Sequence, residues 1–228
     1  MFSIKNNYQQ IQQRILLAEQ QANRVDEVQL LAVSKRHTMD KIVSLHQLGQ
    51  LDFGESYLQE AIEKIEQLQQ YPIIWHFIGP IQSNKTRPIA QLFDWVHSVD
   101  RLKIAQRLND QRYQGKTALN ICLQVNINTE TSKSGFSLSE VNSAVEQVIN
   151  LPQLKLRGLM AIPKKSAYID QQKQNFALLK EKFNQLNQQF SLNMDTLSMG
   201  MSGDLEAAIS QGATIIRVGS ALFGERDK

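Results

Sequence analysis

Hydrophobic residues along the chain recur with two periods, one typical of strands and the other typical of helices. Short apolar runs, such as 29–34 and 73–78, have the length and composition of buried strands. Between such runs, apolar residues recur every three or four positions, as they do on one face of a helix, and 170–189 shows this most clearly. The pattern therefore predicts a chain in which strands alternate with helices.

The alternation continues along the whole chain. Eight strands are expected, at 29–34, 51–54, 73–78, 94–97, 119–126, 154–160, 194–197 and 214–218. Helices are expected near the N-terminus, around Ile89, and at 39–48, 57–68, 101–111, 138–149, 170–189, 204–210 and 220–223. Eight strand–helix units predict an α/β fold with a parallel sheet closed into a (β/α)8 TIM barrel, here with an extra N-terminal helix. A doubly wound open sheet is the alternative, although it usually has fewer strands.

Composition adds limits to this picture. The 228 residues contain no linker, so a single domain over 1–228 is expected. The single cysteine, Cys122, rules out a disulfide framework and favours the reducing cytoplasm. No apolar run approaches the roughly 18 residues of a membrane span, and the first residues do not resemble a signal peptide. The small net charge of +3 comes from scattered basic residues, so nothing indicates a nucleic-acid partner.

Candidate chemistry lies where a barrel carries its active site, at the carboxyl ends of the strands and in the loops that follow. Lys35 ends the first strand with the parity of Leu31 and Val33, which directs it toward the barrel mouth. A lysine that loses water there, near other cations, gives up its proton more readily and becomes a nucleophile for a carbonyl carbon. The alternative is a lysine just beyond the strand that reaches into solvent.

A phosphate site is expected after the seventh and eighth strands, as in many barrels. Gly219 and Ser220 follow the last strand, where a glycine lets backbone amides approach an anion and a hydroxyl can donate. The carboxylates of Asp204 and Glu206, at the start of a helix, would repel a dianion. The phosphate is therefore placed nearer Ser198, Gly219 and Ser220, with two ordinary glycine turns as the alternative interpretation.

Other polar residues carry weaker signals. The four histidines have no metal-ligand spacing, and one cysteine cannot complete a zinc site, so no metal is expected. His76, between Trp75 and Phe77, has the surroundings of a core residue. Cys122 lies within a strand and is expected to be inert packing. Lys133 is by default a mobile loop lysine.

Six segments spread over nearly the whole chain form a recognisable set: LLAVSK (30–35), FGE (53–55), WHFIGPIQSNK (75–85), RGLM (157–160), LSMGMS (197–202) and RVGSALFG (217–224). In these segments the sequence resembles the pyridoxal phosphate homeostasis proteins. The resemblance implies a barrel of the alanine racemase N-terminal-domain type and pyridoxal 5′-phosphate as the cofactor. The sequence departs from the family at Ser56 and His37, where the family commonly has asparagine and lysine.

The resemblance also implies a role for each candidate residue. Lys35 matches the lysine that holds the cofactor as an internal aldimine, and Arg217 matches the arginine that faces the pyridine nitrogen. The residues that match phosphate contacts are Ser198, Gly219 and Ser220. Lys133 matches a loop lysine proposed as a second attachment point. Because an arginine stays protonated, it leaves the pyridine nitrogen unprotonated, which suits holding the cofactor more than fast chemistry on it.

The expected function is therefore homeostasis of pyridoxal phosphate in the cytoplasm, by sequestration, buffering or delivery. The expected partners are the cofactor, amino acids and apoenzymes that need the cofactor; the chain is expected to be a monomer that contacts neither nucleic acid nor membrane. Two alternatives remain, an amino-acid racemase that uses the same aldimine and a Schiff-base aldolase that acts on a sugar phosphate. The sequence ends four residues after Gly224, without the domain that supplies a second catalytic group in racemases, so little turnover is expected.

Overall fold

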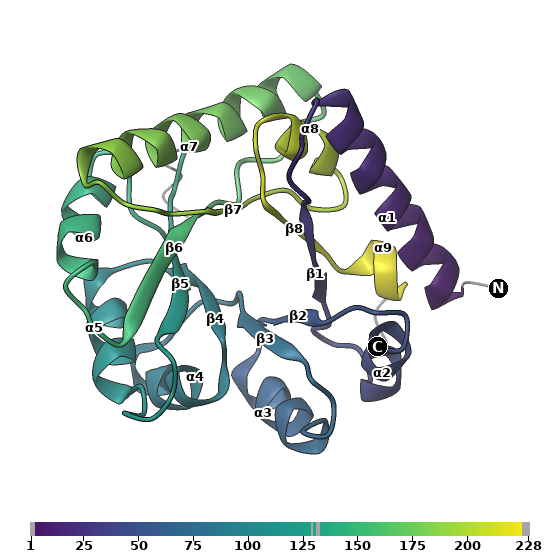
Figure 1. Cartoon of the computed structure of the whole chain (residues 1–228), viewed down its shortest axis with the longest axis horizontal. Coiled ribbons are helices and arrows are strands. Elements are labelled where there is room, and N and C mark those ends of the chain that lie inside the picture. The colour runs from purple at the N-terminus through teal and green to yellow at the C-terminus, as the bar shows by residue number, and fades with distance from the viewer. Residues whose placement is uncertain (1–2, 129, 131–132, 225–228) are drawn as a thin grey trace.

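Eight parallel strands close into a barrel in the computed structural model, which describes residues 3–128, 130 and 133–224 (Figure 1). Each strand pairs with its neighbour in sequence, and the last pairs back with the first, so the sheet has no free edge. The strands are β1 (Gln29–Val33), β2 (Asp52–Glu55), β3 (Ile74–Phe77), β4 (Trp95–Val99), β5 (Leu119–Gln124), β6 (Leu154–Met160), β7 (Thr196–Ser198) and β8 (Ile215–Val218). The predicted (β/α)8 barrel is confirmed, and the open sheet is not formed.

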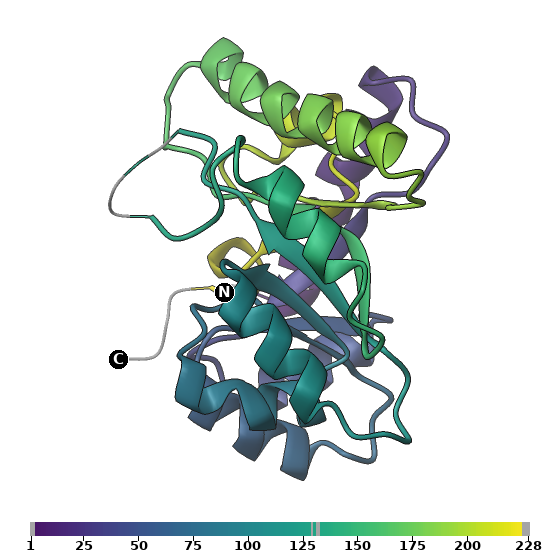
Figure 2. The same cartoon turned by 90° about the vertical axis from the view of Figure 1, so that its left-hand side faces the viewer.

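Helices surround the strands, as Figures 1 and 2 show from two directions. They are α1 (Ile4–Gln21), α2 (Met39–His46), α3 (Leu58–Gln67), α4 (Thr86–Leu92), α5 (Leu102–Gln111), α6 (Val141–Val148), α7 (Ile169–Gln189), α8 (Leu205–Ser210) and α9 (Ser220–Phe223), with a 3₁₀ turn, η1, at Ser83–Lys85. Their apolar faces are buried as the helical period predicts; in α7 the fully buried side chains include Phe176, Leu179 and Leu186. No described helix is long and apolar enough to cross a membrane.

The predicted elements form, with boundaries that shift by a few residues. The strand expected at 119–126 ends at Gln124, because Val125 forms an isolated bridge to Phe136 in the following loop. The helix expected at 138–149 begins at Val141, after a turn that Ser137 and Glu140 hold by mutual hydrogen bonds. The turn η1 was not predicted.

The extra N-terminal helix, α1, lies outside the barrel against α2, α8 and α9 (Figure 1). Its buried residues are Ile11, Ile15 and Ala18, which recur at the helical spacing and so share one face. On the same helix, Arg14 pairs with Glu206 of α8 at 2.7 Å and donates to the Ser202 carbonyl oxygen at 3.0 Å. This helix therefore fixes the loop between β7 and α8.

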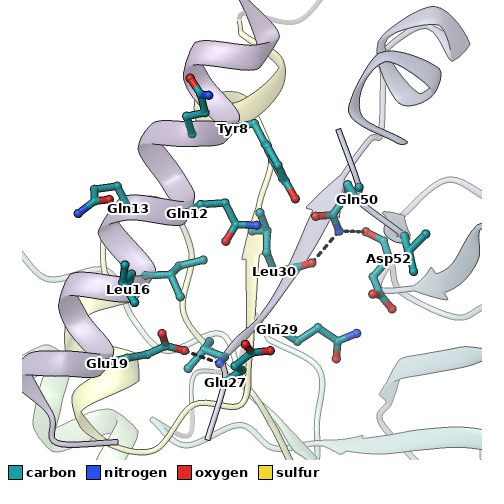
Figure 3. Close-up of a pocket in the computed structure, with 15 residues that line it drawn as sticks. Tyr8, Gln12, Gln13, Leu16, Glu19, Glu27, Gln29, Leu30, Gln50 and Asp52 are labelled. Carbon is teal, nitrogen blue, oxygen red and sulfur yellow. Dashed lines mark hydrogen bonds between the residues drawn. The ribbon is translucent and has the colours of Figure 1, made fainter. Parts of the chain in front are cut away.

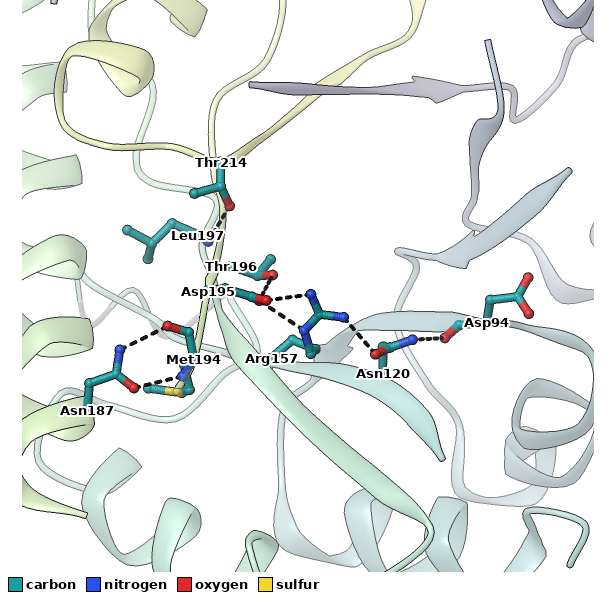
Figure 4. A network of polar contacts seen from close by, with 9 residues as sticks. All are labelled: Asp94, Asn120, Arg157, Asn187, Met194, Asp195, Thr196, Leu197 and Thr214. Atoms are coloured by element: carbon teal, nitrogen blue, oxygen red, sulfur yellow. Dashed lines mark hydrogen bonds and ion pairs between the residues drawn. The ribbon is translucent and has the colours of Figure 1, made fainter. Parts of the chain in front are cut away.

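A polar network joins the amino ends of β4 to β7 (Figure 4). The Arg157 guanidinium donates to Asn120 Oδ1 at 3.0 Å and to the Asp195 carboxylate at 2.9 Å, and Asn120 donates to the Asp94 carbonyl oxygen. The same guanidinium lies over the Trp95 ring, 4.7 Å from its centroid. These contacts tie the strand starts together at one end of the barrel, and the candidate site lies at the other end.

Candidate functional site

A cavity of about 580 Å³ lies at the carboxyl ends of the strands, the face on which barrels carry their sites. This volume falls within the range of small-molecule sites, roughly 300–1,000 Å³. Residues from β1 and β8, from several loops after strands and from α7 line the cavity. Four of the five residues predicted from the sequence meet there: Lys35, Arg217, Gly219 and Ser220.

Lys35 lies in the turn after β1, and hydrogen bonds hold the backbone of this turn on both sides. The Ser34 N–H donates to the Gly54 carbonyl oxygen at 3.0 Å, and the Arg36 N–H donates to the Glu60 carboxylate at 2.6 Å. Arg36 has a φ of 60°, a left-handed conformation that costs a non-glycine residue about 1–3 kcal/mol. Such strain persists only where the surroundings fix the chain, so the Lys35 side chain starts from a fixed backbone.

A buried ion pair stabilises the same turn through a hydrogen bond to Ser34. Lys64 of α3 and Glu55 at the end of β2 are 4% and 0% exposed, and their charged atoms lie 2.7 Å apart. Lys64 Nζ also donates to the Ser34 carbonyl oxygen at 2.8 Å and to the Glu60 carboxylate at 2.6 Å. Burial raises the pKa of Glu55, and the nearby Lys64 charge opposes the rise. The pair thus links β2 and α3 to the residue just before Lys35.

Arg217 is almost fully buried, and three oxygen atoms orient its guanidinium. Its Nη1 donates to the carbonyl oxygen and the hydroxyl of Ser198 at 2.6 and 2.8 Å, and its Nη2 donates to the Ala161 carbonyl oxygen at 3.0 Å. Burial lowers the pKa of Arg217 to about 10, although the Asp204 carboxylate opposes the shift. The guanidinium therefore stays charged at neutral pH and keeps one orientation at the cavity.

Ser198 is the predicted site residue that the structure does not bring to the cavity wall. Its side chain is fully buried inside the barrel, and its hydroxyl lies between Arg217 Nη1 and His97 Nδ1, at 2.8 and 2.7 Å. A hydroxyl whose hydrogen already has an acceptor has none to donate to a phosphate. Ser202, which was not predicted as a site residue, does line the cavity. The signal that could have found it is the pair of loop glycines around it, Gly200 and Gly203.

The loop between β7 and α8 forms another part of the wall. Asp204 Oδ1 accepts from the Met201 N–H at 2.6 Å, and burial raises the pKa of this carboxyl. Glu206, whose charge was expected to repel an anion, pairs instead with Arg14 at 2.7 Å. Burial acts to raise the pKa of Glu206, but the hydrogen bond and charge of Arg14, together with a backbone hydrogen bond, outweigh burial, and the pKa is lowered. Of the two carboxylates, Asp204 is therefore the one that faces the cavity.

The lining suits an anionic molecule that carries a phosphate. Among the described lining residues, Lys35, Lys165 and Arg217 are cationic, against the single carboxylate of Asp204. Hydroxyl donors also surround the space: Ser56, Ser166, Ser202 and Ser220. At Gly219 a Cβ atom would lie 3.3 Å from the Val33 carbonyl oxygen, so a side chain would crowd the junction of β8 and β1. This donor set can bind phosphate oxygens, and Lys35 supplies an amine to the same space.

Two other residues considered from the sequence lie away from this cavity. Lys133 pairs with Glu130 at 2.7 Å and donates to the Ile162 carbonyl oxygen at 3.1 Å, beside a smaller cavity of about 240 Å³. Ile78 and Ile162 border both cavities, so the two are adjacent. Cys122 is fully buried, and burial raises its pKa to about 12, which keeps the thiol protonated. Among the described residues, no group of histidine, cysteine and acidic side chains could hold a metal ion.

A larger cavity, of about 770 Å³, lies near the amino ends of β1 and β2, beside α1 (Figure 3). Its wall includes Tyr8, Gln50 and Asp52, and the Gln50 amide donates to the carbonyl oxygens of Leu30 and Asp52. None of the predicted site residues lines it.

The fold and the cavity define a barrel of the alanine racemase type, and the family described as alanine racemase, N-terminal domain, matches residues 3–227. The chain is 54% identical to the pyridoxal phosphate homeostasis protein of Pseudomonas aeruginosa, over 100% of this chain and 97% of that protein. It is 48% identical to the protein of the same name from Pasteurella multocida, over 99% and 98%. PipY of Synechococcus elongatus, solved with pyridoxal phosphate bound, is 33% identical with a TM-score of 0.86, over 97% and 100%. The chain belongs to the family of pyridoxal phosphate homeostasis proteins, as the resemblance of its motifs predicted.

Proposed function

We propose that this protein binds pyridoxal 5′-phosphate in the cavity of about 580 Å³ and takes part in the homeostasis of that cofactor in the cytoplasm. The observation that carries the proposal is the meeting of Lys35, Arg217, Gly219 and Ser220 at one cavity of suitable size and charge. The family name supports the same function, and so does the bound cofactor in PipY.

Lys35 is the proposed point of covalent attachment. Its Nζ adds to the aldehyde carbon of the cofactor and one water molecule leaves, which gives a Schiff base. The fixed turn around Lys35 favours this step because the backbone is already ordered and little backbone freedom is lost when the bond forms. The bound cofactor supplies an electron-accepting ring, and the protein supplies its binding and orientation.

The other lining residues orient the cofactor in this proposal. The phosphate lies at the end of β8, where Gly219 and Ser220 offer backbone and hydroxyl donors, and Ser202 faces the same space. Arg217 faces the pyridine nitrogen as a cation, so that the nitrogen stays unprotonated. Ser198 contributes by holding Arg217 rather than by touching the phosphate.

The proposed role is to hold and release the cofactor rather than to turn over a substrate. An uncharged, unprotonated pyridine ring stabilises a carbanion poorly, and racemisation needs proton-transfer groups on both faces of the reacting carbon. The proposal includes a monomer that exchanges the cofactor with amino acids or with apoenzymes. Deuterium incorporation at the α-carbon of alanine in heavy water, at rates on the order of 1–10³ s⁻¹, would replace this proposal with a racemase.

Titration with pyridoxal phosphate, followed by visible absorption, tests the proposal. The wild-type protein is expected to develop a Schiff-base band that borohydride removes, and Lys35→Ala is expected to lose the band while keeping its circular dichroism. Lys103→Ala, on the exposed side of α5, is the matched control and keeps the band. A colourless wild-type protein would contradict the proposal and would favour an aldolase.

Phosphate recognition has its own test. Hydrogen bonds to a charged group contribute about 1.5–3 kcal/mol each, so losing two of them weakens binding at least a hundredfold. Pyridoxal without phosphate is expected to bind that much more weakly than pyridoxal phosphate, measured by the same titration. Equal affinities would show that the phosphate is not bound by these donors.

A further inference from the structure

A chain of polar side chains, all buried except the partly exposed Asp52, crosses the inside of the barrel and ends at Arg217. From the Arg217 end, Nη1 lies 2.8 Å from Ser198 Oγ, and Ser198 Oγ lies 2.7 Å from His97 Nδ1. His97 Nε2 lies 2.9 Å from His76 Nδ1, and His76 Nε2 lies 2.9 Å from Asp52 Oδ1. We call these five side chains the relay.

The relay passes through the barrel interior rather than along the sheet. His97 belongs to β4 and Ser198 to β7, and β5 and β6 lie between these strands in the sheet. Their side chains can meet at 2.7 Å only inside the barrel. The side chains of His76, His97 and Ser198 are fully buried, where barrels usually have branched apolar residues. Polar groups at such a place are costly unless each finds a partner.

The two ends of the relay determine the direction of every hydrogen bond. A guanidinium only donates, so Ser198 Oγ accepts from Arg217; the remaining partner for the hydroxyl hydrogen among the described residues is His97 Nδ1. His97 Nδ1 is therefore unprotonated, and its Nε2–H donates to His76 Nδ1. His76 Nε2–H then donates to the Asp52 carboxylate, which only accepts.

Hydrogen bonds that run in the opposite direction along the relay leave atoms without a partner when both imidazole rings are neutral. If His97 carried its proton on Nδ1, the Ser198 hydrogen would have no acceptor among the described residues. His76 would then present a bare Nε2 to the Asp52 carboxylate, which would place two acceptors 2.9 Å apart. One arrangement of protons therefore satisfies every atom of the relay, with both histidines neutral and protonated at Nε2. Burial, His76 and Arg217 all lower the pKa of His97, which agrees with a neutral ring.

We propose that His97 is a positioning residue for Arg217. His76 and Asp52 orient His97, and His97 in turn holds the guanidinium, through the Ser198 hydroxyl, in the orientation it has at the cavity. Without the Ser198 hydroxyl, Nη1 keeps only the Ser198 carbonyl oxygen, and the guanidinium can tilt about its two carbonyl acceptors. Asp52 lies at the start of β2 and lines the larger cavity, so the relay connects opposite ends of the barrel. The effect on cofactor binding rests on the proposed function, whereas the relay itself does not.

Nitrogen-15 NMR of the imidazole rings in the cofactor-free wild-type protein tests the relay without any substitution. Both His76 and His97 are expected to be neutral at neutral pH, each with its proton on Nε2. A proton on His97 Nδ1, or a charged His97 ring, would overturn the relay. This result holds whether or not the protein binds pyridoxal phosphate, so it separates failure of the relay from failure of the proposed function.

Cofactor affinity then tests the positioning role, using His97→Phe and His97→Gln. Phenylalanine keeps a flat ring but removes both nitrogens, and we expect about tenfold weaker binding of pyridoxal phosphate, or about 1.4 kcal/mol. Glutamine offers an acceptor oxygen and a donor NH2 group in place of the two imidazole nitrogens, and the variant is expected to bind within about threefold of the wild type. If the histidine only filled space, phenylalanine would be the better replacement, and that order of affinities would overturn the proposal.

A double-mutant cycle completes the test. Ser198→Ala is expected to weaken binding about as much as His97→Phe, because both break the same link to Arg217. The double variant should then bind no more weakly than either single variant, whereas independent effects would add. His46→Phe, which lies outside the relay on α2, is the control and keeps wild-type affinity. Additive losses would overturn the proposal.

Discussion

Replacing Lys64 by methionine removes the cation from the buried ion pair beneath the Lys35 turn. Glu55 is 0% exposed, so its charge cannot be solvated once Lys64 is gone. Removing one partner of a buried pair costs about 3–5 kcal/mol, because the other charge is left without compensation. The side chain of Glu60 is 27% exposed, so water can replace its partner and its contribution is small. We therefore expect Lys64→Met to lower the free energy of unfolding by about 3–5 kcal/mol.

Urea unfolding at pH 7, followed by circular dichroism, measures this change. Lys103→Met, on an exposed helical position, is the matched control and should stay within about 0.5 kcal/mol of the wild type. Adding Glu55→Gln to Lys64→Met removes the uncompensated charge and keeps an acceptor for the Ser34 hydroxyl, so it should recover most of the loss. A loss below about 1 kcal/mol for Lys64→Met, or a double variant no more stable than the single one, would refute this reasoning.

Two further predictions concern stability. The pKa of His97 in the folded protein lies well below 6.5. When the pH falls below about 6.5, His97 therefore takes up a proton in the unfolded chain but stays neutral in the folded protein. The free energy of unfolding should therefore decrease as the pH is lowered from 7 to 5, by up to about 1.4 kcal/mol per pH unit. Urea unfolding of His97→Gln should show a smaller decrease per pH unit, and an unchanged decrease would contradict the neutral state of His97 in the folded protein. At Gly158 a Cβ atom would lie 1.7 Å from the Thr196 carbonyl oxygen, so Gly158→Ala should lose about 3 kcal/mol or more, whereas Gly203→Ala, with open space around it, should lose little. Equal stability of the two alanine variants would show that β6 and β7 can separate at no cost.

The fold could be predicted from the sequence because the spacing of apolar residues that marks a strand or a helix is a property of a short segment. Runs such as 29–34 and the face of 170–189 are set by burial against the barrel, so the pattern of apolar residues reports them directly. Boundaries were less accurate where side chains decide them, as in the turn that Ser137 and Glu140 close before α6. The positive φ of Arg36 could not be foreseen, since the N–H of this turn residue bonds to Glu60 of α3.

The candidate site was predictable to the extent that barrel topology brings strand ends together. Lys35 and Arg217 lie far apart in sequence but meet at one cavity because β8 pairs with β1. The same rule put Ser198 near the phosphate, but strand parity cannot tell whether an inward side chain reaches the cavity or bonds within the barrel. The contact between Ser198 and His97 depends on shape across the interior, so nothing in the local sequence reports it.

Mass spectrometry of the protein after loading with pyridoxal phosphate and reduction with borohydride tests the central claim most directly. Reduction turns the Schiff base into a stable amine, so the modified lysine can be located by peptide mapping. The adduct is expected on Lys35, at the edge of the cavity that Arg217 and Ser220 share. An adduct chiefly on Lys133, or on any lysine other than Lys35, would contradict the account.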